Sequence, residues 1–275
     1  MLIIDNFSVY ARVIILMAVL IVIALIQQHF KNKESHKNLG DIYSILLTAA
    51  LGVNLLTLTT NWLFIFIAIE TVSISSYILV GYFSNTKKQT EAAMKYVLFG
   101  AVSAAVMLYG LSLLYGFTGN LDFSSLAHIQ GLMVAPKVMT SIAILFLLAG
   151  IGFKLGFVPF HMWTPDVYEG APTPITAFLS TVPKIGAIIL LSRLIQAWVS
   201  TAFYFSEITL LFVIVAALVT MLVGNLIALR QTDIKRMMAY SSIGHTGFLL
   251  MAVLSTQTEA PQILLFYLAV YTMMN

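Results

Sequence analysis

Apolar runs about as long as a membrane is thick dominate the sequence and constrain its fold more than any other feature. A helix needs roughly 20 apolar residues to cross the hydrocarbon core of a bilayer. We expect spans at 9–29, 41–60, 62–83, 91–117, 138–158, 173–199, 207–230, 234–255 and 262–275. Only 9% of the 275 residues are charged, against about 25% in a typical soluble domain. The sequence therefore predicts an all-α, polytopic transmembrane helix bundle in a lipid bilayer.

Basic residues alternate between the connections and so predict an orientation. Connections after odd-numbered spans hold Lys31, Lys33, Lys37, Lys87, Lys88, Arg230, Lys235 and Arg236, whereas those after even-numbered spans hold only Lys137. Because short cytoplasmic loops carry an excess of Lys and Arg, the odd-numbered exits are expected in the cytoplasm and the N-terminus outside. The connection 118–137, with Gly119-Asn120 and Pro136, is expected to be a turn-rich external loop.

Composition excludes several kinds of site. The chain has no cysteine, which excludes disulfides, thiolate-bound iron–sulfur clusters and cysteine zinc sites. The basic residues are dispersed and the net charge is only +3, so nucleic-acid binding is not expected. No strand–GxGxxG–helix unit for a dinucleotide is present.

Ionisable residues inside the apolar runs are the candidates for function, because each costs about 2.5–3.5 kcal/mol at mid-helix. Glu70 lies about 12 Å into its run at 1.5 Å per residue; the alternative is a carboxylate that reaches the headgroups. Lys95 follows Glu91 by one turn. It is either a functional residue or half of an ordinary surface pair that snorkels outward.

Two further lysines lie beside helix-breaking residues. Lys154 is surrounded by glycines and Pro159 in GIGFKLGFVP, which predicts a broken helix near residues 150–172. Broken helices are tolerated in membranes where they line a cavity or pack against protein; the alternative is a snorkelling lysine. Lys184 follows Pro183 and lies roughly 16 Å into its run, near the midplane. Its alternative role is an ion pair that only holds helices together.

Two histidines complete the candidate set. His161 lies in a segment with Asp166 and Glu169 that is too polar to face lipid. This segment is either a re-entrant loop or a short helix packed under the break, or else an interfacial loop with Trp163 at the membrane surface. His245 has Ser241, Ser242 and Thr246 nearby. A hydrated polar chain and a purely structural histidine both remain open there.

These residue types suit proton transfer. A lysine in low dielectric has its pKa lowered, and a nearby carboxylate raises it again. Movement of the carboxylate or of water would toggle the lysine between its charged and neutral forms. Histidine suits the intervening positions because its ordinary pKa lies near neutrality.

The segment GIGFKLGFVPFHMWTPDVYEGAPTPITAFLSTVPKIGA resembles the signature of the subunit N family of bacterial NADH-quinone oxidoreductase, the antiporter-like membrane subunits of respiratory complex I. EAAMKYVLFGA and IKRMMAYSSIGHTGFLL resemble the same family. The resemblance implies an antiporter-like fold of 14 helices with two inverted five-helix repeats, each with a broken helix and a central lysine. Glu70, Lys95, Lys154, Lys184 and His245 match the family's polar positions on its fifth, sixth, seventh, eighth and tenth helices.

By motif order the chain corresponds to helices three to eleven of that plan. Two helices are expected to be missing before residue 1, and the twelfth, with the second repeat's lysine, after residue 275. The chain is therefore expected to be truncated at both ends. We expect one transmembrane domain over 1–275, with the first repeat at about 41–199 and the start of the second at about 207–275.

The expected function is a proton-translocating membrane-arm subunit of NADH:quinone oxidoreductase in the bacterial cytoplasmic (inner) membrane. Its proton relay would comprise Glu70, Lys95, Lys154, Lys184 and His245, with His161 as a weaker candidate. The chain itself is expected to bind no cofactor or metal, so that NADH, FMN, iron–sulfur clusters and quinone belong to partner subunits. The alternatives are a subunit of a related cation/proton antiporter or membrane-bound hydrogenase, and a structural scaffold.

Overall fold

A computed structural model describes residues 2–30, 39–82, 86–199, 204–255 and 260–275. Over these residues the secondary structure is helical, apart from two isolated antiparallel bridges. The described residues form no β-sheet beyond these bridges. The helices are α1 (Asn6–Phe30), α2 (Leu39–Leu58), α3 (Trp62–Gly81), α4 (Lys87–Thr118), α5 (Leu126–Val134), α6 (Lys137–Leu155), α7 (Trp163–Gly170), α8 (Thr173–Val199), α9 (Tyr204–Ala228), α10 (Ile234–Leu254) and α11 (Ala260–Met274).

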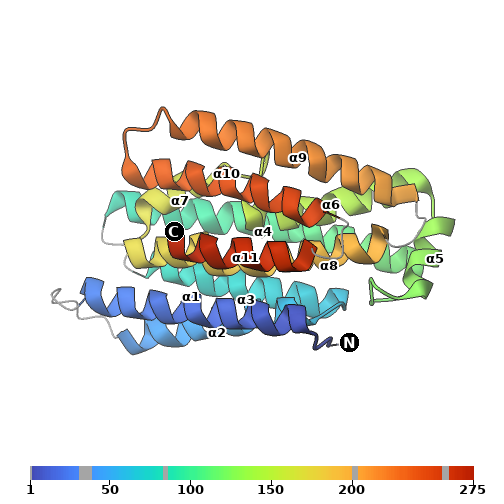
Figure 1. Cartoon of the computed structure of the whole chain (residues 1–275), viewed down its shortest axis with the longest axis horizontal. Coiled ribbons are helices and arrows are strands. Elements are labelled where there is room, and N and C mark those ends of the chain that lie inside the picture. Colours follow the sequence, from blue (N-terminus) through green and yellow to red (C-terminus); the bar gives the residue numbers. More distant parts are fainter. Residues whose placement is uncertain (1, 31–38, 83–85, 200–203, 256–259) are drawn as a thin grey trace.

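The long helices lie side by side along the longest axis of the molecule, as in a bundle that crosses a bilayer (Figure 1). Within the described ranges, 8 helices are long and apolar enough to span a membrane, and Pro261–Met274 is a shorter apolar helix. They coincide with the nine apolar runs of the sequence to within a few residues. The predicted all-α, polytopic transmembrane helix bundle is confirmed.

Helix α8 forms the centre of the bundle and carries Lys184. It packs against α1, α2, α6 and α10, and nearly all of its residues are buried. Its sequence is apolar around its whole circumference, as expected for a helix with no face to the surroundings. A side chain placed on α8 is therefore held inside the protein rather than in lipid.

The helix break predicted near residues 150–172 is confirmed between α6 and α7. Helix α6 ends at Leu155, and Gly156 adopts a left-handed conformation with φ of 69°, which costs glycine little because it has no Cβ. The backbone groups that the break frees find new partners. Trp163 Nε1 donates to Phe153 O at 3.0 Å, and Val158 N donates to Thr220 Oγ1 at 3.0 Å. The break is therefore satisfied within the protein, as a membrane interior requires.

One end of the bundle gathers the basic connections. The end of α3, the start of α4 and the α9–α10 connection lie at the same end as α7, opposite α5 and the N-terminus (Figure 1). This end carries Lys88 and Arg236, which both contact α7. Lys31, Lys33 and Lys37 fall outside the described residues. The arrangement agrees with the alternation of charge along the sequence.

The connection 118–137, which was predicted to be external, contains more structure than the expected turn-rich loop. Gly119 ends α4 in a left-handed conformation, but α5 follows, with the Ser125 side chain accepting from His128 N at its start. Helix α5 has 9 residues and is too short to cross a bilayer. The turn signals at 119–120 predicted a loop, and the short apolar helix α5 that follows them was not predicted from the sequence.

Candidate functional site

Lys184 is the most deeply buried charged side chain of the candidate set, with 1% of its surface exposed. Its ammonium group donates to Ser242 Oγ at 2.6 Å, Thr246 Oγ1 at 3.0 Å and Ser242 O at 3.1 Å. All three acceptors are neutral and lie on α10. Among the described residues no carboxylate lies within 4.0 Å of this ammonium. The described structure thus gives Lys184 a cradle of neutral oxygens in place of the ion pair considered as an alternative.

A hydrogen-bonded chain leads from Lys184 to α11. Ser242 Oγ lies 2.9 Å from Tyr271 Oη, and Tyr271 Oη donates to Ser180 O at 2.9 Å. A tyrosine hydroxyl has one proton to donate. Because that proton bonds Ser180 O, Ser242 must donate to Tyr271. The order is therefore Lys184 to Ser242 to Tyr271 to the α8 backbone.

His245 lies next to this chain. Its Nδ1 is 2.7 Å from Tyr267 Oη, and the positive charge of Lys184 acts on its imidazole ring. Tyr267 and Tyr271 are four residues apart, so they share one face of α11. Helix α11 therefore places the Tyr267 hydroxyl beside His245 and the Tyr271 hydroxyl beside Ser242 of α10.

Lys154 lies at the end of α6 and binds α3. Its Nζ donates to Ser73 Oγ at 2.5 Å and lies 5.6 Å from the centre of the Tyr77 ring. Glu70, Ser73 and Tyr77 are spaced for one face of a helix. Glu70 interacts electrostatically with Lys154, but the two do not approach within 4.0 Å. Glu70 Oε1 is buried and has no hydrogen-bond partner among the residues that the structure describes. The carboxylate and ammonium are thus close without being joined.

The helix break links the two lysine sites. Thr246 Oγ1 accepts from Lys184, and its one proton is shared between Ser242 O of the same helix at 2.9 Å and Leu155 O at 3.2 Å. Leu155 directly follows Lys154 and is the last residue of α6. A carbonyl left free by the end of α6 therefore connects the polar groups around Lys184 to the residue beside Lys154. The break positions both sites at once.

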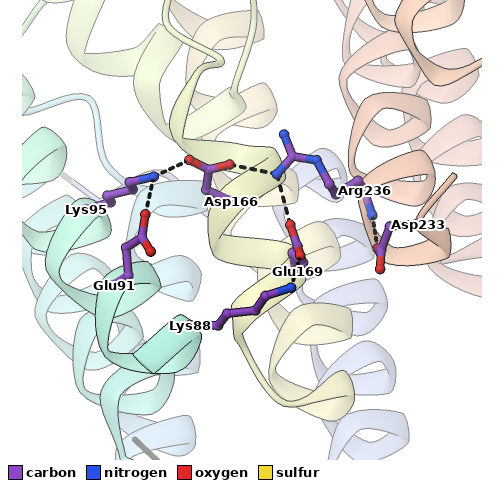
Figure 2. A network of polar contacts seen from close by, with 7 residues as sticks. All are labelled: Lys88, Glu91, Lys95, Asp166, Glu169, Asp233 and Arg236. Carbon is purple, nitrogen blue, oxygen red and sulfur yellow. Dashed lines mark hydrogen bonds and ion pairs between the residues drawn. The ribbon is translucent and has the colours of Figure 1, made fainter. Parts of the chain in front are cut away.

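Lys95 belongs to a separate ionic network that joins α4, α7 and α10 (Figure 2). Its Nζ lies 2.6 Å from Asp166 Oδ2 and 2.7 Å from Glu91 Oε1. Arg236 Nη1 bonds Asp166 Oδ1 at 2.8 Å and Glu169 Oε2 at 2.9 Å. The remaining member, Lys88, lies 2.9 Å from Glu169 Oε1. The surface pair expected on α4 is present, and Asp166 adds a second partner from another helix.

The network balances its own charge around a pocket of about 150 Å³. Burial raises the pKa of Asp166, but hydrogen bonds from Lys95 and Arg236 outweigh it and hold this pKa below its ordinary value. Hydrogen bonds from Lys88 and Arg236 likewise hold the pKa of Glu169 below its ordinary value. Both carboxylates are therefore ionised near neutral pH, and α7 is held by ion pairs on two sides.

His161 is set apart from the other candidates. It lies in the break, just before α7, and is 9% exposed. Its Nδ1 is buried without a hydrogen-bond partner, and its polar contact is with the backbone of Pro159. The short-helix alternative for this segment is the one observed, because α7 begins at Trp163. Trp163 is buried against Phe153 and therefore does not face lipid, as an aromatic residue of a membrane belt would.

Several residues of the site were not identified from the sequence. They are Ser73, Tyr77, Asp166, Glu169, Arg236, Tyr267 and Tyr271. Asp166 and Glu169 were noted only as polar residues of the break. The spacing of Tyr267 and Tyr271 on an otherwise apolar helix was an available signal.

The fold and the site together define a multi-pass membrane protein with ionisable groups buried between its helices. The family described as "NADH:quinone oxidoreductase/Mrp antiporter, TM" matches residues 59–275. NADH-quinone oxidoreductase subunit N 2 of Chloroherpeton thalassium is 38% identical over 99% of this chain, and NAD(P)H-quinone oxidoreductase subunit 2 of Prochlorococcus marinus is 40% identical over 98%. The chain belongs to this family of antiporter-like membrane subunits, alongside NADH-quinone oxidoreductase subunit N.

Solved structures agree with this assignment. A chain of respiratory complex I from Thermus thermophilus is 33% identical, with a TM-score of 0.78 over 98% of this chain and 55% of its own length. A chain of an archaeal membrane-bound sulfane sulfur reductase is 25% identical, with a TM-score of 0.81 over 96% of this chain and 54% of its own. The Mrp complex of a Dietzia species, at 21% identity and a TM-score of 0.82 over 98% of this chain and 48% of its own, shares the fold.

The chain spans about half the length of the relatives that it matches. It covers 54% of the Chloroherpeton protein and 52% of the Prochlorococcus protein. The predicted division into a first repeat at about 41–199 and a second repeat from about 207 stays a prediction.

Proposed function

We propose that the chain is part of a proton-translocating membrane-arm subunit of an NADH:quinone oxidoreductase. Electron transfer in partner subunits would drive proton movement through it. The relatives named as NADH-quinone oxidoreductase subunits support this assignment. The single observation that carries it is the burial of Lys184 against three neutral oxygens.

The chemistry of that cradle suits a site that exchanges protons. Among the described residues no carboxylate pairs with Lys184 to hold its proton, whereas three acceptors stabilise the ammonium when it forms. Ser242 and Tyr271 each accept one hydrogen bond and donate another, so a proton could pass along their hydroxyls. Lys154 and the nearby Glu70 would supply the charge movement that shifts the equilibrium at Lys184.

We assign the remaining roles by position. Lys95 and its ionic network would form the mouth on the predicted cytoplasmic side, and His245 would continue the relay beside Tyr267. His161 is a weaker candidate because it contacts none of the others. NADH, FMN, iron–sulfur clusters and quinone would lie in partner subunits, and the complex would reside in a bacterial cytoplasmic membrane.

The test is to replace Lys184 in the complete complex. Lys184→Met keeps an apolar side chain of similar length in the buried site, and Lys184→Ala removes it. Proton uptake into inverted membrane vesicles is measured while NADH is oxidised, with assembly checked by the amount of intact complex. We expect assembly to persist and pumping to fall sharply. Lys87→Ala is the control, because Lys87 is exposed on the first turn of α4.

Normal pumping by an assembled Lys184→Met complex would refute the relay role and favour a structural scaffold. A cation/proton antiporter or a membrane-bound hydrogenase is the alternative complex, because relatives of both respiratory and Mrp type share the fold. Neighbouring genes distinguish them. Genes for NADH-binding and iron–sulfur subunits favour the first assignment, whereas a cluster of small antiporter subunits favours the second.

A further inference from the structure

A groove runs between α1 and α2 on the outside of the bundle. It has a volume of about 480 Å³. Its lining residues include Val13 and Leu16 from α1, and Leu51 and Leu55 from α2. Each of these four side chains is at least 38% exposed, so the groove opens to the outside of the bundle. Both helices are long and apolar enough to span a membrane, so the groove lies at the depth of the hydrocarbon core.

Arg12 also lines this groove, and its charge is not neutralised. Its Nε donates to Ser8 O at 3.3 Å, and among the described residues its guanidinium group makes no ion pair. The other polar lining residue, Asn54, donates to Ala50 O in its own helix. The nearest acidic residue along the chain, Asp5, is held by Arg193 at 2.7 Å. The terminal NH2 groups of the Arg12 guanidinium make no ion pair with the described residues and can therefore bind an anionic ligand.

The position of Arg12 fits a phospholipid headgroup. It lies six residues after Asn6, the first residue of α1, or roughly 9 Å along the axis. An arginine at that depth can extend its guanidinium toward the headgroup region while its stem stays in hydrocarbon. The start of α1 lies beside the end of α2, because Ile3 N donates to Leu58 O at 2.6 Å. The deeper part of the groove, toward Leu16 and Leu51, is entirely apolar.

We propose that the α1–α2 groove is a binding site for an anionic phospholipid, with its phosphate on Arg12 and an acyl chain between the two helices. A guanidinium binds phosphate oxygens through two parallel hydrogen bonds. A protein helix in the same place would have to carry a carboxylate into hydrocarbon to neutralise Arg12, whereas a lipid brings its charge at the right depth. This site is independent of the proposed proton path.

Photolabelling of the complete complex tests the proposal. The complex is placed in phosphatidylcholine vesicles that contain a trace of phosphatidylglycerol with a diazirine on its acyl chain, or the matching phosphatidylcholine probe. After illumination, labelled peptides are mapped by mass spectrometry. We expect labelling within 9–16 and 51–58, about fivefold stronger with the anionic probe, because one basic residue near the surface contributes about 1 kcal/mol toward anionic lipid.

Three variants separate charge from shape. Arg12→Gln should abolish the preference for the anionic probe, and Arg12→Lys should retain most of it. Leu51→Trp should reduce labelling by both probes, because it fills the groove without touching Arg12. Arg230→Gln removes an exposed arginine at the end of α9 and should change nothing.

Any of three results would overturn the proposal. The first is equal labelling by the two probes in the unmodified complex, and the second is a preference that survives Arg12→Gln. The third is a groove already covered by protein. A photoreactive benzoylphenylalanine at position 51 would then cross-link to a neighbouring subunit or another part of the chain, and neither lipid probe would label the groove.

Discussion

Replacing Asp166 by asparagine should weaken the ionic network that holds α7. Asp166 accepts from Lys95 with one oxygen and from Arg236 with the other. Asparagine removes the charge and turns one of these acceptors into a donor. Glu169 would still bind Arg236 and Lys88, so α7 should loosen rather than detach.

The magnitude follows from the exposure of the two ion pairs. The side chains of Asp166, Lys95 and Arg236 are 32%, 37% and 31% exposed. Exposed ion pairs contribute about 0.2–1 kcal/mol each, and partial burial places these two near the top of that range. We therefore expect Asp166→Asn to lower the free energy of α7 opening by about 1–2 kcal/mol, or roughly 5–30-fold in the open population.

The absence of cysteine from this chain offers a direct assay. Val167 on α7 is 0% exposed, so Val167→Cys places a unique thiol of this chain where a reagent reaches it only when α7 opens. Its rate of alkylation, followed by mass spectrometry of the α7 peptide, reports the open population. Glu91→Gln is the matched control, because Glu91 also binds Lys95 but from the same helix. That pair does not tie α7, so its loss should change the rate by no more than about twofold.

Equal alkylation rates in Asp166→Asn and Glu91→Gln would refute this reasoning. Such a result would mean that apolar packing of α7 holds it in place and that the ion pairs add nothing measurable. A large increase in both variants would instead place the stabilisation in Lys95 itself.

Three further predictions follow from the same geometry. Tyr271→Phe should leave Ser242 without its acceptor and lower the stability of the folded chain by about 1 kcal/mol, because two hydrogen bonds within the membrane are lost. The complex should still assemble but pump fewer protons per NADH oxidised. Unchanged pumping would show that the hydroxyl chain is not part of the proton path. Gly156→Ala should destabilise the helix break by about 1–2 kcal/mol, because an L-residue is strained at a φ of 69°. It should also speed the alkylation of Val167→Cys on α7. Asp166 and Glu169 have pKa values held below the ordinary range. The stability that their ion pairs give to α7 is therefore complete above about pH 5 and is lost only below about pH 4. Hydrogen exchange of α7, corrected for its intrinsic pH dependence, should show no carboxylate-linked opening at pH 6 to 8.

The lysines show how far sequence reasoning reached. Burial of a charge is expensive wherever an apolar run surrounds it, so Lys154 and Lys184 stand out without any knowledge of their neighbours. The helix break could likewise be predicted, because glycine and proline act through local backbone geometry. Lys95 lies near a polar end, where the same cost does not apply, and its sequence supported two interpretations equally.

The partners of these residues depend on helix packing. Lys184 binds Ser242 across 58 residues of sequence, and Lys95 binds Asp166 across 71. Nothing in the local run indicates which face of a distant helix will arrive there, because an apolar helix in lipid has no polar side to orient it. Glu70 illustrates the limit, since its depth in an apolar run could be predicted, whereas its place near Lys154 without an ion pair could not.

The sequence by itself determined that this chain lies in a membrane, where its helices run, where one helix breaks and which charges are buried. Those properties follow from hydrophobic length, backbone geometry and the cost of moving a charge out of water, which all act over a few turns of chain. The tertiary structure alone decided that hydroxyls of α10 bind Lys184, that Tyr271 of α11 extends this chain of hydroxyls, and that ion pairs join α7 to α4 and α10. Those contacts arise from the close packing of distant helices, which a pattern within one helix does not encode.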